Sequence, residues 1–510
     1  MVEMLPVWLV QTLQLLTYAF VFAVGAGLLL MAFFYLVDAT QTKDAVRHNY
    51  PVVGRFRALF SSLGEFFRQY FFAMDREEMP FNRAERNWIY ESAKGHDNTQ
   101  AFGSTKNLSD TGSYIFVNCP FPTLESDGAR TKPMEIGPFA ARPYMARSIF
   151  NISAMSFGAL STPAVQALSR GAKLAGCWLN TGEGGLSPHH LSGGADIVFQ
   201  IGTAKYGVRD GEGRLSDEKL RDIAALDQVR MFEVKLSQGA KPGKGGILPA
   251  AKVTKEIAAI RGIPVGEDSI SPNRHPEIDN VGELLDFIDR VRLVTGKPTG
   301  FKSVIGAYGW LDSLCAEIMA RGIESAPDFI TVDSGDGGTG AAPMALMDNV
   351  GLTLSESLPM VVGILHRHGL RNRIRIIASG KLVTPAEVAW ALCTGADFVN
   401  SARGFMFSLG CIQALKCSKN SCPTGITTHN KRLQRGLDPQ DKAVKVANYC
   451  LTLVHDVETI AHSCGVVEPR RLRRFHVRIM QSNGQSVPMD VLYPQPEVVQ
   501  LGREPVLAGG

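Results

Sequence analysis

The chain has 510 residues, 45% of them hydrophobic, which is enough for one large α/β barrel with extensions or for two or three ordinary domains. Its 53 basic and 49 acidic residues leave a net charge of +4 without long runs of one sign, so no nucleic-acid-binding surface is expected. Nine scattered cysteines, an odd number, favour reduced thiols over a disulfide framework.

An apolar segment begins the chain. No charged residue occurs over 4–37, and residues 15–37, "LLTYAFVFAVGAGLLLMAFFYLV", are long enough to cross a bilayer core of roughly 30 Å. We expect a transmembrane anchor over 1–40 rather than a cleaved signal peptide, because only Glu3 precedes the run and bulky residues end it. A buried core helix is the alternative.

Basic residues follow the apolar segment. Lys43, Arg47, Arg55 and Arg57 all lie on its C-terminal side. The positive-inside rule therefore predicts a single-pass protein of the inner (cytoplasmic) membrane whose catalytic domain lies in the cytoplasm, which agrees with reduced cysteines.

The region 41–147 is expected to hold a juxtamembrane amphipathic helix and then a leader to the main domain. Aromatic and leucine residues recur there at helical spacing among arginines, which is typical of a helix that lies on a membrane surface. Packing against the catalytic domain is the alternative. The apolar positions include Phe56, Leu59, Phe60, Leu63 and Phe67.

From about residue 148, short apolar runs alternate with helix-like segments, and nearly every run ends in a glycine-rich or polar cluster. Eight such units predict a (β/α)8 TIM barrel over 148–430, with its active site at the C-terminal ends of the strands. No GxGxxG motif opens a helix, which disfavours a doubly wound dinucleotide-binding sheet. A C-terminal helical extension and an irregular tail are expected over 431–510. The eight runs are 148–158, 178–185, 197–202, 228–236, 298–306, 328–338, 373–381 and 397–404.

The loops after the seventh and eighth strands predict a phosphate site. Gly380 lets backbone N–H groups approach an anion, and Lys381 adds a cation. Ala402 and Arg403 form the second loop of this site. Barrels commonly bind a phosphate between these two strands. An ordinary glycine turn with surface cations is the alternative.

Other candidate residues follow strands 2, 3, 5 and 6. Glu183 lies between glycines in "NTGEGG", and Gly337, Gly338 and Gly340 lie in "DSGDGGTGAAP", although both loops could be simple tight turns. Lys302 is a lysine inside an apolar strand, which is costly unless it faces an anion or a flavin ring.

Gln200 in the third strand is a comparable candidate, and Lys241 lies in "LSQGAKPGKGGILP", a loop that could hold a carboxylated substrate.

Cys411, Cys417 and Cys422 form a C-x5-C-x4-C run after the eighth strand. Zinc sites usually use paired C-x2-4-C spacing and four ligands, whereas three cysteines suit a [3Fe-4S] cluster. Three unrelated buried thiols are the alternative. His429 could ligate instead, but a structural role is the simpler interpretation.

Taken together, the motifs "AMSFGALS", "NTGEGG", "QGAKPGKGGILP", "GDGGTGAAP" and "CPTGITTHN" resemble the FMN-binding synthase domain of the glutamate synthase family over about 148–470. The resemblance implies FMN, a [3Fe-4S] cluster on Cys411, Cys417 and Cys422, and reductive amination of 2-oxoglutarate, through 2-iminoglutarate, to L-glutamate. It implies substrate contacts or catalytic roles for Glu183, Lys241 and Lys302. The residues implied to bind FMN are Met155, Ser156, Gln200, Lys302, Gly337, Gly338, Gly340, Gly380, Lys381, Ala402 and Arg403.

The chain departs from the family pattern at the substrate loop. The usual Gln of "GEGGQLPG" is Ile247, and Lys244 stands where a Glu is common. Losing a polar partner can shift specificity strongly. We expect this chain to have neither the family's N-terminal glutaminase domain nor its C-terminal glycine-repeat domain. Its ammonia is therefore expected to come free from solution or from a separate partner.

Several functions therefore stay open. The first is a glutamate synthase-like oxidoreductase acting on CH–NH2 donors, with an electron-donor protein or reductase subunit, a 2-oxo acid or amino-acid substrate, and a lipid bilayer as partners. The second is an N-substituted glutamate synthase, which transfers an amine to glutamate and needs no net external electrons. The third is a membrane redox module with another substrate. An inosinate-dehydrogenase-like barrel would need a catalytic cysteine after strand 6, where the chain has none. A homo-oligomer is compatible with each of them.

Overall fold

The computed structural model describes residues 6–41, 44–67, 71 and 74–497, and the account below concerns these residues. The chain divides into two compact units, Met1–Ala84 and Glu85–Gly510. The predicted irregular tail lies outside the described residues from 498 onward, as does Lys43.

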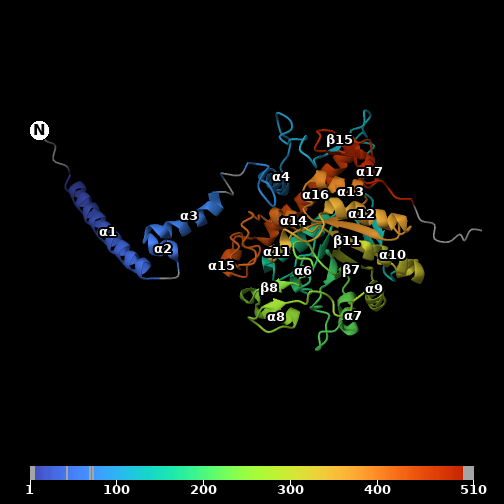
Figure 1. Cartoon of the computed structure of the whole chain (residues 1–510), viewed down its shortest axis with the longest axis horizontal. Coiled ribbons are helices and arrows are strands. Elements are labelled where there is room, and N and C mark those ends of the chain that lie inside the picture. The colour runs from blue at the N-terminus through green and yellow to red at the C-terminus, as the bar shows by residue number, and fades with distance from the viewer. Residues whose placement is uncertain (1–5, 42–43, 68–70, 72–73, 498–510) are drawn as a thin grey trace, which may run out of the picture. The chain divides into compact units, whose positions relative to one another are not determined.

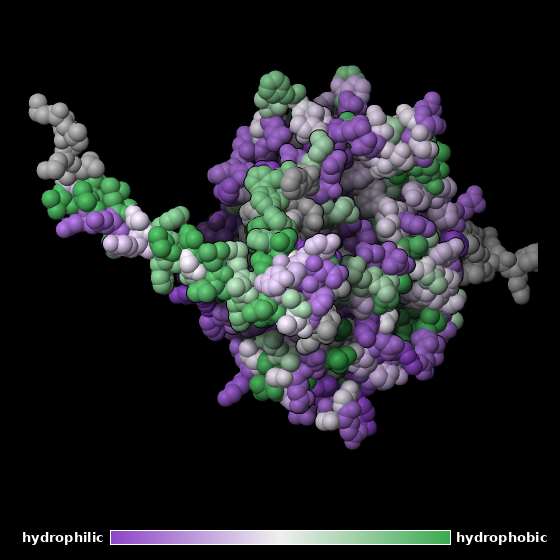
Figure 2. All heavy atoms as spheres, turned by 60° about the vertical axis from the view of Figure 1, so that its left-hand side comes forward, coloured by the Kyte–Doolittle hydropathy of each residue, from purple (hydrophilic) through white to green (hydrophobic). Residues whose placement is uncertain are grey.

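The first unit contains three consecutive helices, α1 (Val7–Thr40), α2 (Ala45–Asn49) and α3 (Val53–Phe67). By length and composition α1 can cross a membrane, and none of its most apolar 18-residue window is buried. Figure 2 shows its mostly hydrophobic surface beside the grey N-terminus. The apolar helix thus lies where the sequence predicts it, and its place in a bilayer remains a prediction.

The second unit is built on a closed barrel of eight parallel strands, as the sequence predicts (Figure 1). Each predicted apolar run contains one strand, because a strand buried on both faces reads as a nearly continuous hydrophobic run. In barrel order the strands are β4 (Phe150–Ile152), β5 (Trp178–Asn180), β6 (Asp196–Ile201), β7 (Val229–Lys235), β10 (Thr299–Val304), β11 (Phe329–Asp333), β12 (Arg375–Ser379) and β13 (Phe398–Ser401).

Helices between the strands cover the barrel. Ser161 caps the N-terminus of the first of them through its side chain, and Gly176 ends that helix with a φ of 71°. Serine and glycine commonly occupy these two positions at helix ends. The covering helices include α5 (Thr162–Ala175), α7 (Asp217–Ala225), α9 (Val281–Thr295), α10 (Gly309–Arg321), α12 (Leu354–Arg367) and α13 (Pro385–Thr394).

The C-terminal extension is helical but also contains strands. Helix α16 (Pro439–Ser463) packs against α5 and α13. Beyond it, β14 (Val477–Met480) pairs with β15 (Ser486–Pro488) and with β1 (Tyr114–Phe116) of the leader.

Residues 468–477 form a basic segment, but Arg474 within it does not face solvent. This side chain is buried, and its guanidinium donates to the carbonyl oxygens of Tyr493 and Pro359. Its guanidinium therefore links the C-terminal tail to the barrel through hydrogen bonds and does not face solvent.

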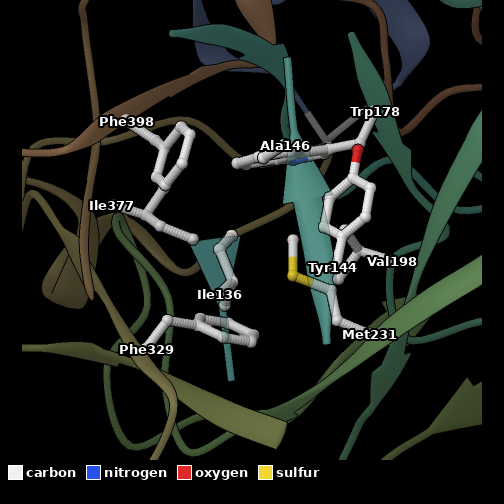
Figure 3. Packing of buried hydrophobic residues seen from close by; sticks show 9 residues of the cluster. All are labelled: Ile136, Tyr144, Ala146, Trp178, Val198, Met231, Phe329, Ile377 and Phe398. Carbon is white, nitrogen blue, oxygen red and sulfur yellow. The ribbon is translucent and has the colours of Figure 1, made fainter. Parts of the chain in front are cut away.

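A hairpin closes the N-terminal end of the barrel. Strands β2 (Met134–Ile136) and β3 (Tyr144–Ala146) pair antiparallel, and their side chains pack among residues near the beginnings of the barrel strands (Figure 3). This packing leaves the opposite end, where the strands finish, for the chemistry. The cluster comprises Ile136, Tyr144, Ala146, Trp178, Val198, Met231, Phe329, Ile377 and Phe398.

Replacing Phe398, whose exposure is 0%, tests this packing. Phe398→Ala removes most of a buried ring and leaves a cavity, so we expect a loss of about 3–5 kcal/mol in the free energy of unfolding. Thermal and denaturant unfolding of the solubilised chain, followed by circular dichroism, measures it. Leu293→Ala, at a side chain that is 83% exposed, is the control and should change little.

Candidate active site

A cavity opens at the C-terminal ends of the barrel strands. Binding sites for small molecules usually form at this place in the fold. The lining residues are Ser153, Ala154, Gln200, Lys235, Gln238, Lys302, Asp333, Gly338, Ser379, Gly380, Lys381, Val383, Asn400, Ser401, Ala402 and Arg403.

Most of the residues implied to hold a cofactor meet in this cavity: Gln200, Lys302, Gly338, Gly380, Lys381, Ala402 and Arg403. Met155, Ser156, Gly337 and Gly340 do not line it. Met155 and Ser156 follow the lining residue Ala154 and lie against Gly182, where an added Cβ would come within 2.7 Å of the Ser156 nitrogen.

Gly380 and Lys381 form a tightly packed turn at the cavity wall. Gly380 has a φ of +123°, and a Cβ there would lie 2.4 Å from the Cβ of Ser334, so only glycine fits. Lys381 Nζ lies 2.7 Å from Asp336 Oδ2. The turn thus presents backbone and a positioned cation to the cavity, which suits a phosphate.

Arg403 adds a second cation on the same side. Burial lowers its pKa to about 10, which Asp336 and Asp333 counteract. The expected loop at Ala402 and Arg403 is wrong in one respect, because α14 (Arg403–Ser408) begins there and Ala402 is its N-cap.

Asn400 offers a polar atom without a partner in the same cavity. Its Oδ1 is buried and accepts no hydrogen bond from any residue that the structure describes. Buried acceptors are normally satisfied, so a ligand N–H at this place would complete the site.

Lys302 lies in the barrel interior, as its sequence context predicts. Its Nζ lies 3.1 Å from Asp333 Oδ2, and the same carboxylate oxygen accepts a hydrogen bond from the Gly239 N–H at 2.9 Å. Asp333 was not among the expected residues, although it ends a buried strand and begins the glycine-rich loop. The buried lysine therefore has its anion inside the protein.

A second buried carboxylate, Glu233, escaped the sequence reasoning. Asn180 and Gln200 donate side-chain N–H groups to its Oε1 at 2.8 and 2.7 Å, and the Thr331 hydroxyl donates to Oε2 at 2.6 Å. Glu233 thereby fixes the amide of Gln200 at the cavity wall.

Glu183 and two lysines form a charged cluster beside the cavity. Lys235 Nζ lies 2.9 Å from Glu183 Oε2. Burial would raise the pKa of Glu183, but Lys235 and Lys241 outweigh it and hold that pKa below its usual value. Burial and the charge of Lys235 lower the pKa of Lys241 to about 8. An anionic substrate could bind here between two cations.

Sequence reasoning missed Lys235, although a signal for it exists. Lys235 lies two residues after Glu233 in a strand that is otherwise largely apolar, so both side chains point to the same side of the sheet. Lys302 was predicted because it is a charged residue inside a buried strand. The same argument applies to Glu233 and Lys235.

The three cysteines of the predicted cluster come together on one loop, and all are free thiols. Burial raises the pKa of Cys411 to about 12, and nearby Cys417 and Cys422 add to the rise, which places the three sulfurs within electrostatic reach of one another. Among the described residues no group of three or more His, Cys, Asp or Glu side chains could hold a metal ion. A polynuclear cluster has a different requirement, because each thiolate binds its own iron and the sulfurs need not meet at one point.

The cysteine loop has a constrained backbone. Gln413, Leu415 and Asn420 have φ values of 57°, 54° and 55°, a left-handed conformation that non-glycine residues rarely adopt. Such residues gather at ligand-binding segments, where the surroundings hold them in place. The donor set and this backbone fit an iron–sulfur cluster.

A buried lysine lies beside the cysteine loop. Lys252 donates to the carbonyl oxygen of Ala159 at 2.9 Å and has no carboxylate within 4.0 Å in the part of the chain that the structure describes. Burial lowers its pKa to about 8, and the thiols of Cys417 and Cys422 oppose the fall. The cysteine loop is thus the neighbour of this cation.

His429 has a structural contact. Its ring Nε2 lies 2.9 Å from the carbonyl oxygen of Gly158, which agrees with its interpretation as a structural residue.

Comparison with known proteins places the chain in a family. Residues 123–467 match the conserved region in glutamate synthase. The chain belongs to the glutamate synthase family. Within this glutamate synthase family, it is 38% identical to the glutamate synthase large subunit-like protein YerD of Bacillus subtilis (strain 168), over 95% of this chain and 99% of that protein.

The chain is also 34% identical to the archaeal glutamate synthase [NADPH] of Methanocaldococcus jannaschii, over 69% of this chain and 66% of that protein. Among solved structures, the flavin-binding domain of baker's yeast flavocytochrome b2 aligns with 82% of the chain and 86% of its own length, at 14% identity and a TM-score of 0.45. The barrel itself rests on the strand pairing of the present chain.

Gly380→Ala tests the phosphate turn of this glutamate synthase family member. A Cβ would clash with Ser334 and strain the backbone, so most of the FMN that the sequence resemblance implies should be lost from the purified variant, as measured by absorbance after gel filtration. Gly436→Ala, at a glycine with no neighbouring atom within 4 Å of the added Cβ, is the matched control. Full flavin retention in Gly380→Ala would contradict the assignment.

Proposed function

We propose that the chain is an FMN and iron–sulfur oxidoreductase of glutamate synthase type, which reductively aminates 2-oxoglutarate through 2-iminoglutarate to L-glutamate. Ammonia is either free or supplied by a separate protein. The family membership supports the reaction class, and the names of the relatives, glutamate synthases, support the product.

One observation carries the proposal: Lys235 lines the cavity and at the same time pairs with Glu183. A cofactor in the cavity would therefore lie next to the charged cluster of Glu183, Lys235 and Lys241. The two cations can bind the two carboxylates of a dicarboxylic 2-oxo acid. The carboxylate can accept a proton from a nitrogen nucleophile. Such positioned charges orient a substrate and stabilise the charge that develops during reaction.

The residues of the chain have separate roles in this proposal. Lys381 and Arg403 hold the FMN phosphate, and Gln200, Lys302 and Asn400 bind its ring system. When bound, FMN supplies the hydride and the [3Fe-4S] cluster on Cys411, Cys417 and Cys422 delivers single electrons.

The charged cluster acts on the substrate. Lys235 and Lys241 bind the carboxylates of 2-oxoglutarate and orient its carbonyl carbon. The ionised Glu183 carboxylate takes the proton that the attacking nitrogen loses and returns it to the leaving water, so that 2-oxoglutarate and ammonia give the imine and water. Hydride addition at the imine carbon, together with a proton from solvent to its nitrogen, then gives glutamate.

The proposed setting is the cytoplasmic face of the inner membrane. Helix α1 would form a single span, and the basic residues after it favour a cytoplasmic catalytic unit. Electrons would come from a donor protein or reductase subunit, and a homo-oligomer is compatible with this setting.

Ile247 favours a second candidate function. It lies half-buried in β8 (Ile247–Leu248), paired with β9 (Ser269–Ile270), where relatives of the resembled family carry an amide. An apolar side chain there suits an amine larger than ammonia, as in an N-substituted glutamate synthase. A membrane redox module with another substrate is the remaining alternative.

The deciding experiment mixes dithionite-reduced protein with 2-oxoglutarate and ammonia under anaerobic conditions. We expect flavin reoxidation and formation of glutamate, detected by mass spectrometry. A parallel product assay supplies glutamate and methylamine, and formation of N-methylglutamate in this assay alone would favour the second candidate. No reoxidation in the first reaction would exclude 2-oxoglutarate with ammonia, and no N-methylglutamate in the second would exclude the transfer of this amine to glutamate.

The pKa of Lys241 predicts a pH dependence for substrate binding. Its pKa is about 8, so the ammonium form, which attracts a carboxylate, prevails below pH 8 and is lost as the pH rises through that value. We therefore expect the affinity for 2-oxoglutarate, measured by flavin spectral titration, to be level below pH 7 and to fall above pH 8. Lys241→Met should bind more weakly and lose this fall, whereas Lys244→Met, at an exposed lysine of the same loop, should keep it.

A further inference from the structure

A buried carboxylate lies at the end of the apolar helix α1. Asp38 is 0% exposed and pairs with Arg47 and with Arg55, each at 2.7 Å. The backbone N–H of Val52 donates to the same carboxylate at 3.1 Å. The chain that follows α1 thus turns back and satisfies the charge at its end.

We call this turn the elbow, defined by Asp38, Arg47, Val52 and Arg55. The guanidinium of Arg55 also lies over the ring of Phe34 on α1, 4.0 Å from its centroid. The elbow therefore fixes the beginning of α3 against the end of α1.

Close packing supports the elbow. A Cβ at Gly54 would come within 3.0 Å of the Cα of Arg47, so α2 and α3 approach each other closely. Asp44 caps α2 by accepting from the N–H groups of Val46 and Arg47. These contacts leave little freedom between the helices.

Within the first unit, helix α3 has an exposed apolar face. Its members recur at intervals of three and four residues, which places them on one side of the helix. A contiguous apolar surface of this kind marks an interaction site. They are Phe56, Leu59, Phe60, Leu63 and Phe67, with exposures of 49%, 51%, 66%, 38% and 39%.

We propose that α3 is an interfacial helix whose apolar face inserts into the surface of the bilayer that α1 crosses, and that Asp38 is the positioning residue for it. The inference rests on the proposed membrane anchoring. Continuity is the reason to choose lipid over a second copy of the chain: the elbow holds α3 at the end of α1, which is the depth at which a spanning helix leaves the hydrocarbon core.

Charge compensation indicates what drives the insertion. Asp38 offsets one of the two positive charges of Arg47 and Arg55, and the apolar face is then the main source of affinity. A zwitterionic bilayer should therefore suffice, and anionic lipid should add little.

Photo-crosslinking of the full chain in phosphatidylcholine nanodiscs tests the inference. The photoreactive amino acid p-benzoylphenylalanine replaces Phe60 in one protein and Ser62 in another, a residue two positions along α3 and turned by about 200°. Both side chains are exposed. We expect lipid adducts, detected by mass spectrometry, to be several-fold more abundant at position 60 than at position 62, and to change little when phosphatidylglycerol is added.

Two further variants test the role of the elbow. Asp38→Asn should lower the yield of lipid adducts at position 60 several-fold, because α3 is no longer held at the end of α1. Arg57→Gln removes an exposed charge of α3 outside the elbow and should leave the yield unchanged. The flavin content of each variant controls for the folding of the second unit.

The outcomes separate this inference from the proposed anchoring. Release of the chain from membranes by alkaline carbonate would overturn the anchoring and the interfacial helix together. A chain that resists carbonate, but forms adducts at position 60 with protein instead of lipid, would overturn the interfacial helix alone. An unchanged lipid yield in Asp38→Asn would overturn the role of Asp38.

Discussion

The ion pair between Lys235 and Glu183 connects the two halves of the candidate active site. Lys235 reaches the cavity from the end of β7, and Glu183 belongs to the glycine-rich loop after β5. Neither charge would be stable alone in so buried a place, because an unpaired buried charge costs several kcal/mol. Their pairing allows Lys241 to approach as well, and it lets a cation face the cavity without an external anion.

The same rule of compensation applies around the rest of the barrel mouth. Lys302 pairs with Asp333, and Lys381 pairs with Asp336. Lys252 differs, since the groups beside it are thiols of the cysteine loop, which would be anionic only as thiolates that bind a cluster. The charge of a bound cluster would therefore have a fixed cation beside it, and the reduction potential of such clusters responds to nearby charge.

The sequence predicts the barrel well because each buried parallel strand is a short apolar run that ends in a polar or glycine-rich cluster. It also identifies Gln200, Lys302, Gly380 and Lys381, which line the cavity, since a polar residue or a glycine in such a context is unusual. It does not predict partners distant in sequence, such as Asp333 for Lys302, because side-chain pairing across strands depends on register.

Other features of the structure could not be predicted from the sequence for similar reasons. The hairpin of β2 and β3 that closes the barrel has strands too short to show periodicity. Arg474 belongs to a basic segment that looks solvent-exposed until the carbonyl groups around it are known. At Ile247 the sequence indicates a departure from the family pattern. The effect of that departure on specificity depends on the substrate that binds.

The central claim is that one chain binds both a flavin and an iron–sulfur cluster. Its most direct measurement is the visible and electron paramagnetic resonance spectrum of the purified full chain, together with that of Cys417→Ser. The account predicts bound FMN and a [3Fe-4S] signal in the oxidised protein, with the signal lost and the flavin retained in Cys417→Ser. A wild-type protein that carries flavin but no iron, or a cluster signal that survives in Cys417→Ser, would contradict it.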